Sequence, residues 1–332
     1  MAALVESARP LVSWLTTNPW VQLGNDYAYN VLSIQPDKGF WVAFGQNVLF
    51  FYGTVLLVDA IIPFLFQTRS VQKGEPYKGQ YYMDIYLSTR AFASLARRAL
   101  DARHRAGGRE RRGAGSGGQE RERRGAGSGS LFVKTAYMYI IERLEPYGYT
   151  LLYRQPANSW AHVAYMIMTI VALDVYFDSY FYFGHRLQHV NKWLYKNVHV
   201  VHHWDVCPRA ISGYSFHIIE ALIDFLGEFF MPFLFPINYR LYRGYLLASN
   251  IIHVGGHAGY EFAPLIPFTT GIAVLLFSPF KSVPQLNTVL HHDMHHRYPN
   301  ANFSLYFTHW DRILKTEHPS YRHQAASSEV HD

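Results

Sequence analysis

Long uncharged runs separated by short polar stretches dominate the hydrophobic pattern of this 332-residue chain. Residues 40–58 hold nineteen positions without a charge, and a further apolar run follows Asp59 as far as Phe66. Residues 160–183 form a second apolar run, interrupted by Asp174 and Asp178. Because a helix of about 20 mostly apolar residues can cross a bilayer, the pattern predicts an all-α, multi-pass membrane helical bundle.

Three later runs are also apolar but differ in regularity. Residues 218–236 carry acidic side chains at four-residue steps, which would form one stripe on a helix. Residues 245–257 are predicted to be helical as well. Residues 262–280 contain three prolines, which favours an interfacial hairpin over a membrane span.

The charges beside the first apolar run indicate its orientation. Arg69, Lys73 and Lys78 follow it, and the positive-inside rule places that end in the cytosol. The first 25 residues have no basic segment before an apolar core and no small-residue cleavage site. We therefore expect no cleaved signal peptide.

One segment, residues 97–130, differs abruptly in composition from its surroundings. The nine-residue sequence at 109–117 recurs at 121–129, and residues 97–124 contain ten arginines against four acids, a net charge of +6. That equals the net charge of the whole chain, so the high pI gives no evidence of nucleic-acid binding. With no apolar face to bury, this segment is predicted to be a disordered insertion.

Ten histidines fall into four spaced groups between residues 185 and 296. Residues four apart lie on one helix face, so each pair could aim two imidazoles at one point, and each His-x-x-His-His triplet was expected to converge likewise. Ten ligands exceed one octahedral ion, which predicts two ions sharing a site. The single cysteine, Cys207, excludes thiolate clusters and four-cysteine zinc. The predicted ligands are His185, His189, His199, His202, His203, His253, His257, His292, His295 and His296.

Several polar residues near these groups are candidates for orienting the ligands, since metal-bound histidines usually donate their second N–H to a carboxylate or carbonyl. Asp178 precedes the first histidine pair on the same helix, although an N-cap or a polar helix interface would also explain it. His217 and His291 fit no pair, so a structural role is an equal alternative for them. The candidates are Asp178, His217, Glu220, His291 and Asp293. No catalytic residue beyond the metal ligands is predicted.

The histidine motifs and their flanks resemble a known family. The motifs are His-Arg-Leu-Gln-His at 185–189, the block at 194–203, His-Asp-Met-His-His at 292–296, and the block at 302–312 that ends in Trp-Asp-Arg. Residues 131–316 resemble the fatty acid hydroxylase and sterol desaturase superfamily of membrane di-iron oxygenases. The resemblance divides the chain into a membrane-anchoring region (1–96), the insertion (97–130), a catalytic domain (131–316) and a C-terminal tail (317–332).

This resemblance implies an enzyme of the endoplasmic reticulum membrane with its metal site on the cytosolic side. Two iron ions, for which zinc can substitute on purification, would activate O₂. The resemblance also implies that electrons come from cytochrome b5 or its reductase chain, and no bound nicotinamide or flavin is expected. The substrate would be a lipid, and no nucleic acid is expected as a partner.

The final motif block resembles sterol hydroxylases, whereas residues 151–203 resemble sterol C5-desaturases. A sterol substrate is therefore favoured, with hydroxylation ahead of desaturation. Two alternatives stay open. One is a fatty acyl or sphingoid-base hydroxylase of the same family, and the other is a membrane zinc-binding protein whose metal is hydrolytic or structural.

Deleting residues 97–130 is expected to leave membrane accumulation and activity unchanged, because the segment has no apolar face and loop-closure entropy varies slowly with length. Immunoblots of membrane fractions and product formation would measure both. A deletion variant that fails to accumulate would contradict this prediction and indicate a lipid- or partner-binding role.

Overall fold

The computed structural model describes residues 36–66, 70, 72, 129–261 and 287–327. The predicted insertion up to residue 128 and the proline-rich run at 262–280 lie outside these described residues. Ser130, which the sequence pattern assigned to the insertion, already belongs to a helix, where its Oγ donates a hydrogen bond to the carbonyl of Tyr214 at 2.6 Å.

The described part of the chain is mostly helical, as predicted. The longer helices are α3 (Phe40–Leu56), α7 (Ser130–Leu144), α8 (Trp160–Val190), α10 (Ile218–Leu234), α11 (Tyr239–Gly256) and α13 (Val289–Arg297). The short helical segments are η1 (Pro36–Lys38), η2 (Leu57–Ile61), α4 (Ile62–Phe66), η3 (Glu145–Tyr147), α9 (Lys192–Asn197), η4 (His199–Trp204), η5 (Ala210–Tyr214), α14 (His309–Ile313) and α15 (Tyr321–Ser327). Two-residue strands, β1 (Leu152–Tyr153) and β2 (Ile237–Asn238), pair in parallel.

The first apolar run forms a continuous helical path through α3, η2 and α4. Pro63 has no backbone N–H and its ring crowds the carbonyl of Asp59, four residues earlier. The chain widens into a π-helical turn at η2, which accommodates the proline without a break. The carboxylate of Asp59 accepts a hydrogen bond from the backbone of Ala210 at 3.2 Å, so this turn is tied to η5.

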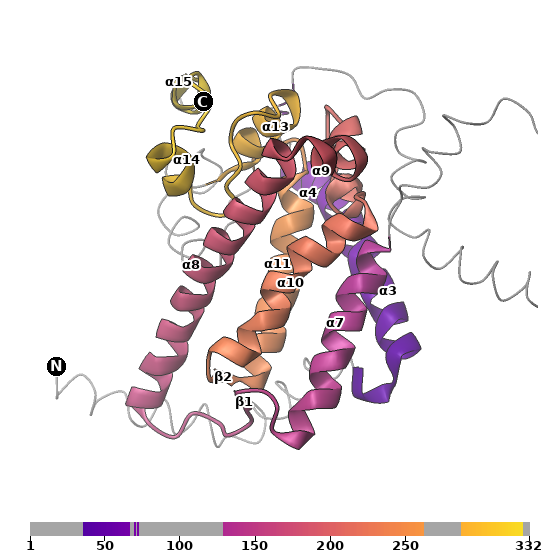
Figure 1. Cartoon of the computed structure of the whole chain (residues 1–332), viewed down its shortest axis with the longest axis vertical. Coiled ribbons are helices and arrows are strands. Elements are labelled where there is room, and N and C mark those ends of the chain that lie inside the picture. Colours follow the sequence, from indigo (N-terminus) through magenta and orange to yellow (C-terminus); the bar gives the residue numbers. More distant parts are fainter. Residues whose placement is uncertain (1–35, 67–69, 71, 73–128, 262–286, 328–332) are drawn as a thin grey trace, which may run out of the picture.

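The long helices run side by side along the molecule, with α7 between α3 and α10 and with α10 against α8 (Figure 1). Gly227 on α10 lies close to α8. A Cβ atom there would clash with the ring of Tyr180 and lie 3.0 Å from Cε2 of Phe177. The absence of a side chain therefore lets α8 and α10 approach closely.

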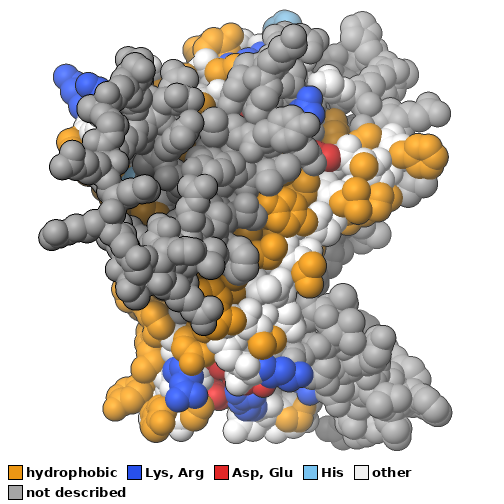
Figure 2. All heavy atoms as spheres, turned by 90° about the vertical axis from the view of Figure 1, so that its right-hand side faces the viewer, with side chains coloured by type: hydrophobic (Ala, Val, Ile, Leu, Met, Phe, Trp, Pro, Cys, Tyr) orange, Lys and Arg blue, Asp and Glu red, His pale blue; other side chains and the backbone are white. Residues whose placement is uncertain are grey.

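Two helical paths, Phe40–Phe64 and Trp160–Val190, are long and apolar enough to cross a membrane. Many apolar side chains of α8 remain exposed, including Ile167, Met168 and Val175. Figure 2 shows hydrophobic side chains over much of the visible surface between charged groups near its two ends. An apolar exterior of this kind suits a lipid environment.

The C-terminal elements α13, α14 and α15 gather at one end of the bundle, beside α9 and the C-terminal end of α8 (Figure 1). Helix α15 lies within the segment that the sequence pattern assigned to the tail. Its Tyr321 is fully buried and packs with Leu290 and Met294 of α13. Helix α15 therefore packs against α13 and covers it at this end of the bundle.

Replacing Gly227 with alanine is expected to destabilise the fold by about 1–3 kcal/mol, because the new methyl group overpacks the contact between α8 and α10. Gly53 in α3 is the matched control, since a Cβ there meets nothing within 4 Å, and Gly53→Ala should raise stability by up to about 1 kcal/mol. Thermal unfolding in one detergent compares the two. Equal melting temperatures would contradict the close approach at Gly227.

Candidate metal centre

Four segments bring histidines to the end of the bundle where α8, η4, α11 and α13 meet (Figure 1). Helix α8 supplies its pair near its C-terminus, and α11 supplies His257 as its C-terminal cap. The two triplets lie on η4 and α13. Nine of the ten predicted imidazoles form two adjoining groups.

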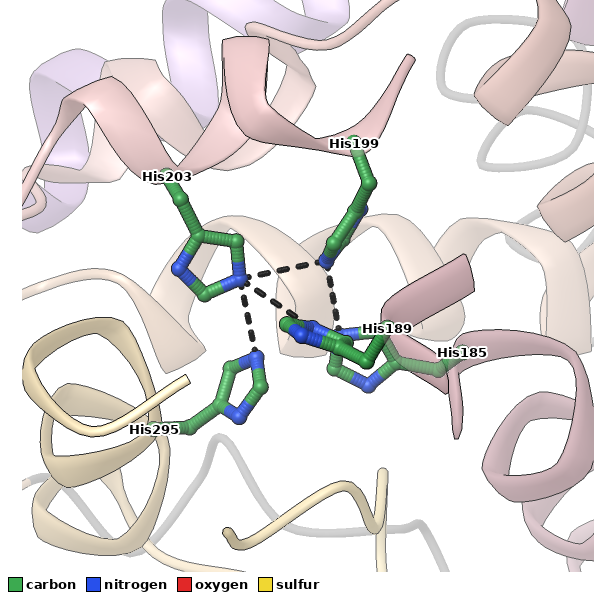
Figure 3. A group of neighbouring side chains, drawn as sticks. All are labelled: His185, His189, His199, His203 and His295. Atoms are coloured by element: carbon green, nitrogen blue, oxygen red, sulfur yellow. Dashed lines mark hydrogen bonds between the residues drawn. The ribbon is translucent and has the colours of Figure 1, made fainter. Parts of the chain in front are cut away.

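Group A consists of His185, His189, His199, His203 and His295, whose ligand atoms all lie within 4.8 Å of one another. Figure 3 shows the five rings pointing toward one another. Nε2 of His203 lies 3.1 Å from Nε2 of His199, 3.1 Å from that of His295 and 3.2 Å from that of His189. The five side chains thus offer nitrogen atoms around one small volume.

Group B consists of His202, His257, His292 and His296. Nε2 of His257 lies 2.9 Å from that of His292 and 3.4 Å from that of His202. The ring centroids of His296 and His203 are 5.0 Å apart, so group B adjoins group A.

Each triplet is divided between the groups, which corrects the expectation that its three members converge. In η4, His199 and His203 belong to group A and His202 to group B. In α13 the division is reversed, because His295 alone joins group A. Consecutive side chains point about 100° apart around the α-helix α13 and about 120° apart around the 3₁₀ helix η4, so the adjacent second and third histidines of each triplet face different groups.

Backbone carbonyls fix the tautomers of several rings. A carbonyl can only accept, so an Nδ1 that contacts one carries the proton and leaves the Nε2 lone pair free. This arrangement holds for four imidazoles. The Nδ1 donates to the carbonyl of Phe303 in His185 (2.9 Å), of His253 in His257 (2.8 Å), of Ala301 in His295 (2.6 Å) and of Asp205 in His296 (2.8 Å).

In both groups Nε2 atoms face one another in a buried space. Burial and neighbouring imidazoles hold the pKa of His202, His203 and His296 well below the usual range, so these rings stay neutral and each keeps one unprotonated nitrogen. The four fixed tautomers turn such a lone pair toward the other rings, where it could ligate a metal ion. With metal–nitrogen bonds of about 2.1 Å, ligand nitrogens lie about 3.0 Å apart in an octahedron and about 3.4 Å apart in a tetrahedron.

The shortest Nε2 separations, from 2.9 to 3.4 Å, match these values, and all ligand atoms of a group lie within 4.8 Å of one another. Imidazole suits iron, zinc, copper and nickel, and groups A and B contain only imidazoles. Both groups therefore fit a transition-metal ion.

His253 lies outside both groups, which corrects its assignment as a ligand. Its Nε2 hydrogen-bonds to the carbonyl of Gly213 on η5, so this nitrogen carries a proton. Its own carbonyl accepts from Nδ1 of His257. His253 thus orients a candidate ligand through its backbone and is not itself a candidate.

Glu220 on α10 does contact a candidate ligand. Its Oε1 lies 2.8 Å from Nδ1 of His199, and both side chains are buried. A carboxylate behind a histidine fixes the ring and makes it a stronger ligand.

His217 and Asp293, in contrast, have structural contacts rather than the predicted contacts with ligand histidines. Nδ1 of His217 accepts a hydrogen bond from the backbone of Ile219 at 3.1 Å and so caps α10. Asp293 pairs with Arg297 one turn later in α13, because its side chain points about 100° away from that of His292.

Asp178 also does not hold the first histidine pair as predicted. Its Oδ1 accepts hydrogen bonds from the backbones of Tyr306 and Phe307 at 2.7 and 3.0 Å. It precedes His185 by seven residues, about 10 Å along α8, which is too far for direct contact. Asp178 instead anchors the loop that follows α13.

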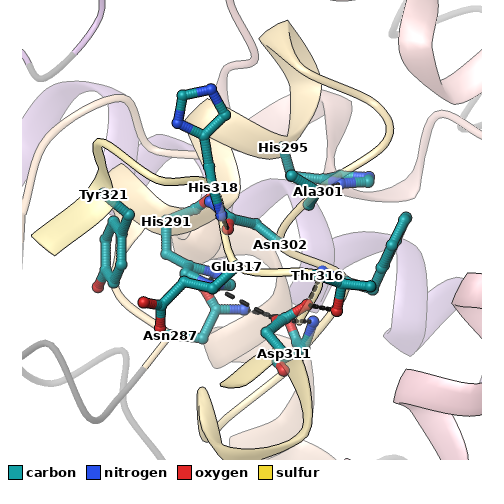
Figure 4. A network of polar contacts seen from close by, with 12 residues as sticks. Asn287, His291, His295, Ala301, Asn302, Asp311, Thr316, Glu317, His318 and Tyr321 are labelled. Carbon is teal, nitrogen blue, oxygen red and sulfur yellow. Dashed lines mark hydrogen bonds and ion pairs between the residues drawn. The ribbon is translucent and has the colours of Figure 1, made fainter. Parts of the chain in front are cut away.

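Asp311, to which the sequence pattern gave no role, anchors the same loop. Its two carboxylate oxygens accept from the backbones of Phe303 and Ser304, each at 2.9 Å. Figure 4 shows this carboxylate beside Thr316, whose Oγ1 donates to it at 2.7 Å. Asp311 lies in the motif block at 302–312 on which the family resemblance rests, and its place in that block is the sequence signal that could have identified it.

His291 belongs to this supporting network and does not contact a ligand. Its Nε2 lies 3.5 Å from Oδ2 of Asp311 and its Nδ1 lies 3.1 Å from Oδ1 of Asn287 (Figure 4). The ring packs edge-on against Tyr321. These contacts hold α13 against the loop whose carbonyls orient His185 and His295.

Comparison with known proteins agrees with this geometry. The family model described as fatty acid hydroxylase matches residues 170–316, which include both histidine groups. No solved structure matches the chain.

Three relatives illustrate the similarity. Lathosterol oxidase of Rattus norvegicus is 31% identical over 53% of this chain and 54% of its own length. A putative methylsterol monooxygenase of Dictyostelium discoideum is 32% identical over 48% of this chain and 54% of its own. Cholesterol 25-hydroxylase of Homo sapiens is 35% identical over 42% of this chain and 47% of its own. The chain thus spans about half the length of these relatives.

Replacing Glu220 with alanine is expected to weaken metal binding about 10- to 100-fold, because Nδ1 of His199 loses its carboxylate. Glu220→Gln keeps an acceptor and should lose less. Asp224→Asn, one turn along α10, is the matched control because its amide oxygen can still accept from Gln188. Metal content after dialysis against graded chelator measures the affinities, and equal values in all three variants would contradict the role of Glu220.

Proposed function

We propose that this chain is a membrane di-iron oxygenase that oxidises a lipid with O₂, since residues 170–316 match the family model described as fatty acid hydroxylase. The observation that carries this proposal is the pair of adjoining all-imidazole groups. The Nε2 lone pairs that the fixed tautomers direct toward the other rings could ligate a cation, and an imidazole environment suits a redox metal.

Groups A and B would each hold one iron ion. Bound iron would supply the redox chemistry by which O₂ oxidises an unactivated C–H bond. The protein's own residues position that chemistry. Backbone carbonyls fix the orientation of His185 and His295, Glu220 orients His199, and the buried surroundings exclude water.

The substrate we propose is a sterol, with hydroxylation ahead of desaturation. This proposal draws on the names of the relatives, which are a lathosterol oxidase, a putative methylsterol monooxygenase and a cholesterol 25-hydroxylase. In hydroxylation one oxygen atom of O₂ enters the C–H bond and the other leaves as water. The two electrons come from an external donor, for which we propose cytochrome b5 or its reductase chain, and the two protons come from solvent.

We place the enzyme in the endoplasmic reticulum membrane, as a multi-pass protein with the histidine groups on the cytosolic side. The two helices long and apolar enough to cross a membrane support a membrane location. The basic residues after the first apolar run support the sidedness.

Replacing His295 of group A or His202 of group B with alanine is expected to lower O₂-dependent product formation by more than about 100-fold, because the loss of a ligand exceeds the loss of its supporting contact. Each variant should also bind less iron per chain. His217→Ser, which keeps a capping acceptor for α10, is the matched control and should retain both properties.

Membranes from iron-replete cells would be assayed for lipid species with one added oxygen or two fewer hydrogens, together with metal content. Activity is measured beside metal content because zinc can replace iron during overexpression. Normal turnover by either alanine variant would refute the site. A zinc-loaded protein whose reaction does not consume O₂ would refute the oxygenase.

A further inference from the structure

A cavity of about 130 Å³ lies between α8 and α11, apart from the histidine groups. Ile170 and Ile252 contribute to its apolar wall, while Asp174, Ser249 and Tyr306 add polar groups. An apolar cavity with a few convergent polar groups is typical of a ligand site, and this volume would hold one end of a lipid.

A second cavity, of about 10 Å³, adjoins it. The two share Ser249, Ile252 and Tyr306 as lining residues, and the smaller one is also lined by Phe181. The ring centroid of Phe181 lies 5.2 Å from that of His185. The lining residues therefore lead from the larger cavity to the first histidine of group A.

Helix periodicity aligns the two sites. Asp174 and His185 are eleven residues apart on α8, which is close to three full turns, so they lie on one face about 16 Å apart along the axis. A lipid bound along this face could place one end at Asp174 and a distant carbon near group A.

The charges around the cavities select the kind of group that would bind. Lys134 and Glu228 are both buried and form an ion pair at 2.6 Å. Oγ of Ser249 donates to the other carboxylate oxygen of Glu228, and Asp174 and Asp224 add two further buried carboxylates. With three carboxylates against one ammonium, the region repels an anionic headgroup, whereas a hydroxyl can donate to a carboxylate.

We propose that the cavity between α8 and α11 binds the hydroxyl end of the lipid substrate and thereby sets which carbon reaches group A. This inference rests on the proposed function and makes its substrate a neutral lipid alcohol, as opposed to a free fatty acid.

Gly244 provides a direct steric test. It lines the cavity, is exposed, and a Cβ there meets nothing within 4 Å, so Gly244→Leu can fold while its side chain obstructs the cavity. Ala248 lines the cavity one turn later, and Ala248→Leu is the second variant. Gly45→Leu on α3, where a Cβ also meets nothing within 4 Å, is the matched control.

Binding of radiolabelled cholesterol to the purified, metal-loaded protein would be measured by equilibrium dialysis in detergent. Both cavity variants should weaken binding about tenfold, as should replacing cholesterol with cholestane, which lacks the hydroxyl. Gly45→Leu should bind as the unmodified protein does. Unchanged binding of cholesterol by both cavity variants, or equal binding of cholestane, would overturn the proposal.

Competition with palmitate tests the charge argument, and displacement of cholesterol by palmitate more strongly than by unlabelled cholesterol would also overturn it. The two proposals fail separately. If His295→Ala abolishes product formation but Gly244→Leu and Ala248→Leu bind cholesterol normally, the cavity assignment alone is wrong. If cholesterol binding depends on the cavity but no oxidised product forms, the oxygenase proposal alone is wrong.

Discussion

Imidazole rings whose nitrogens face one another across 2.9–3.4 Å in a buried space are the constraint around which this end of the protein is built. Protonation of these rings is opposed by burial and by the neighbouring rings. A cation ligated by their unprotonated nitrogens would stabilise the arrangement. Metal binding should therefore contribute to the folding of α13 and η4 as well as to chemistry.

The supports of the histidines are mostly backbone atoms. The carbonyls of Ala301 and Phe303 orient two rings of group A, and the loop that carries them is held by the carboxylates of Asp178 and Asp311. Asp178 and Asp311, which are far apart in the sequence, thus act on the histidine groups by holding the same loop. They influence the candidate ligands through the backbone of that loop and not by direct contact.

Local periodicity explains which features could be predicted from the sequence. The pairing of His185 with His189 depends only on a helix face, and the apolar runs at 40–58 and 160–183 depend only on length and composition. The division of each triplet between groups A and B depends on where the two groups lie in space. The spacing of the histidines along the sequence carries no information on that. The contact of His253 with Gly213 and the π-helical turn before Pro63 likewise depend on competition between neighbouring groups.

Helix α8 is an unbroken α-helix from Trp160 to Val190, and it carries both an apolar exterior and the first pair of candidate ligands. A bilayer thinner or thicker than its apolar length would be met by tilting or by deformation of the lipid. Because His185 and His189 lie on this same helix, they would move with it. The thickness of a surrounding bilayer would therefore set how deeply these two candidate ligands sit below the headgroups, and so which part of a lipid they meet.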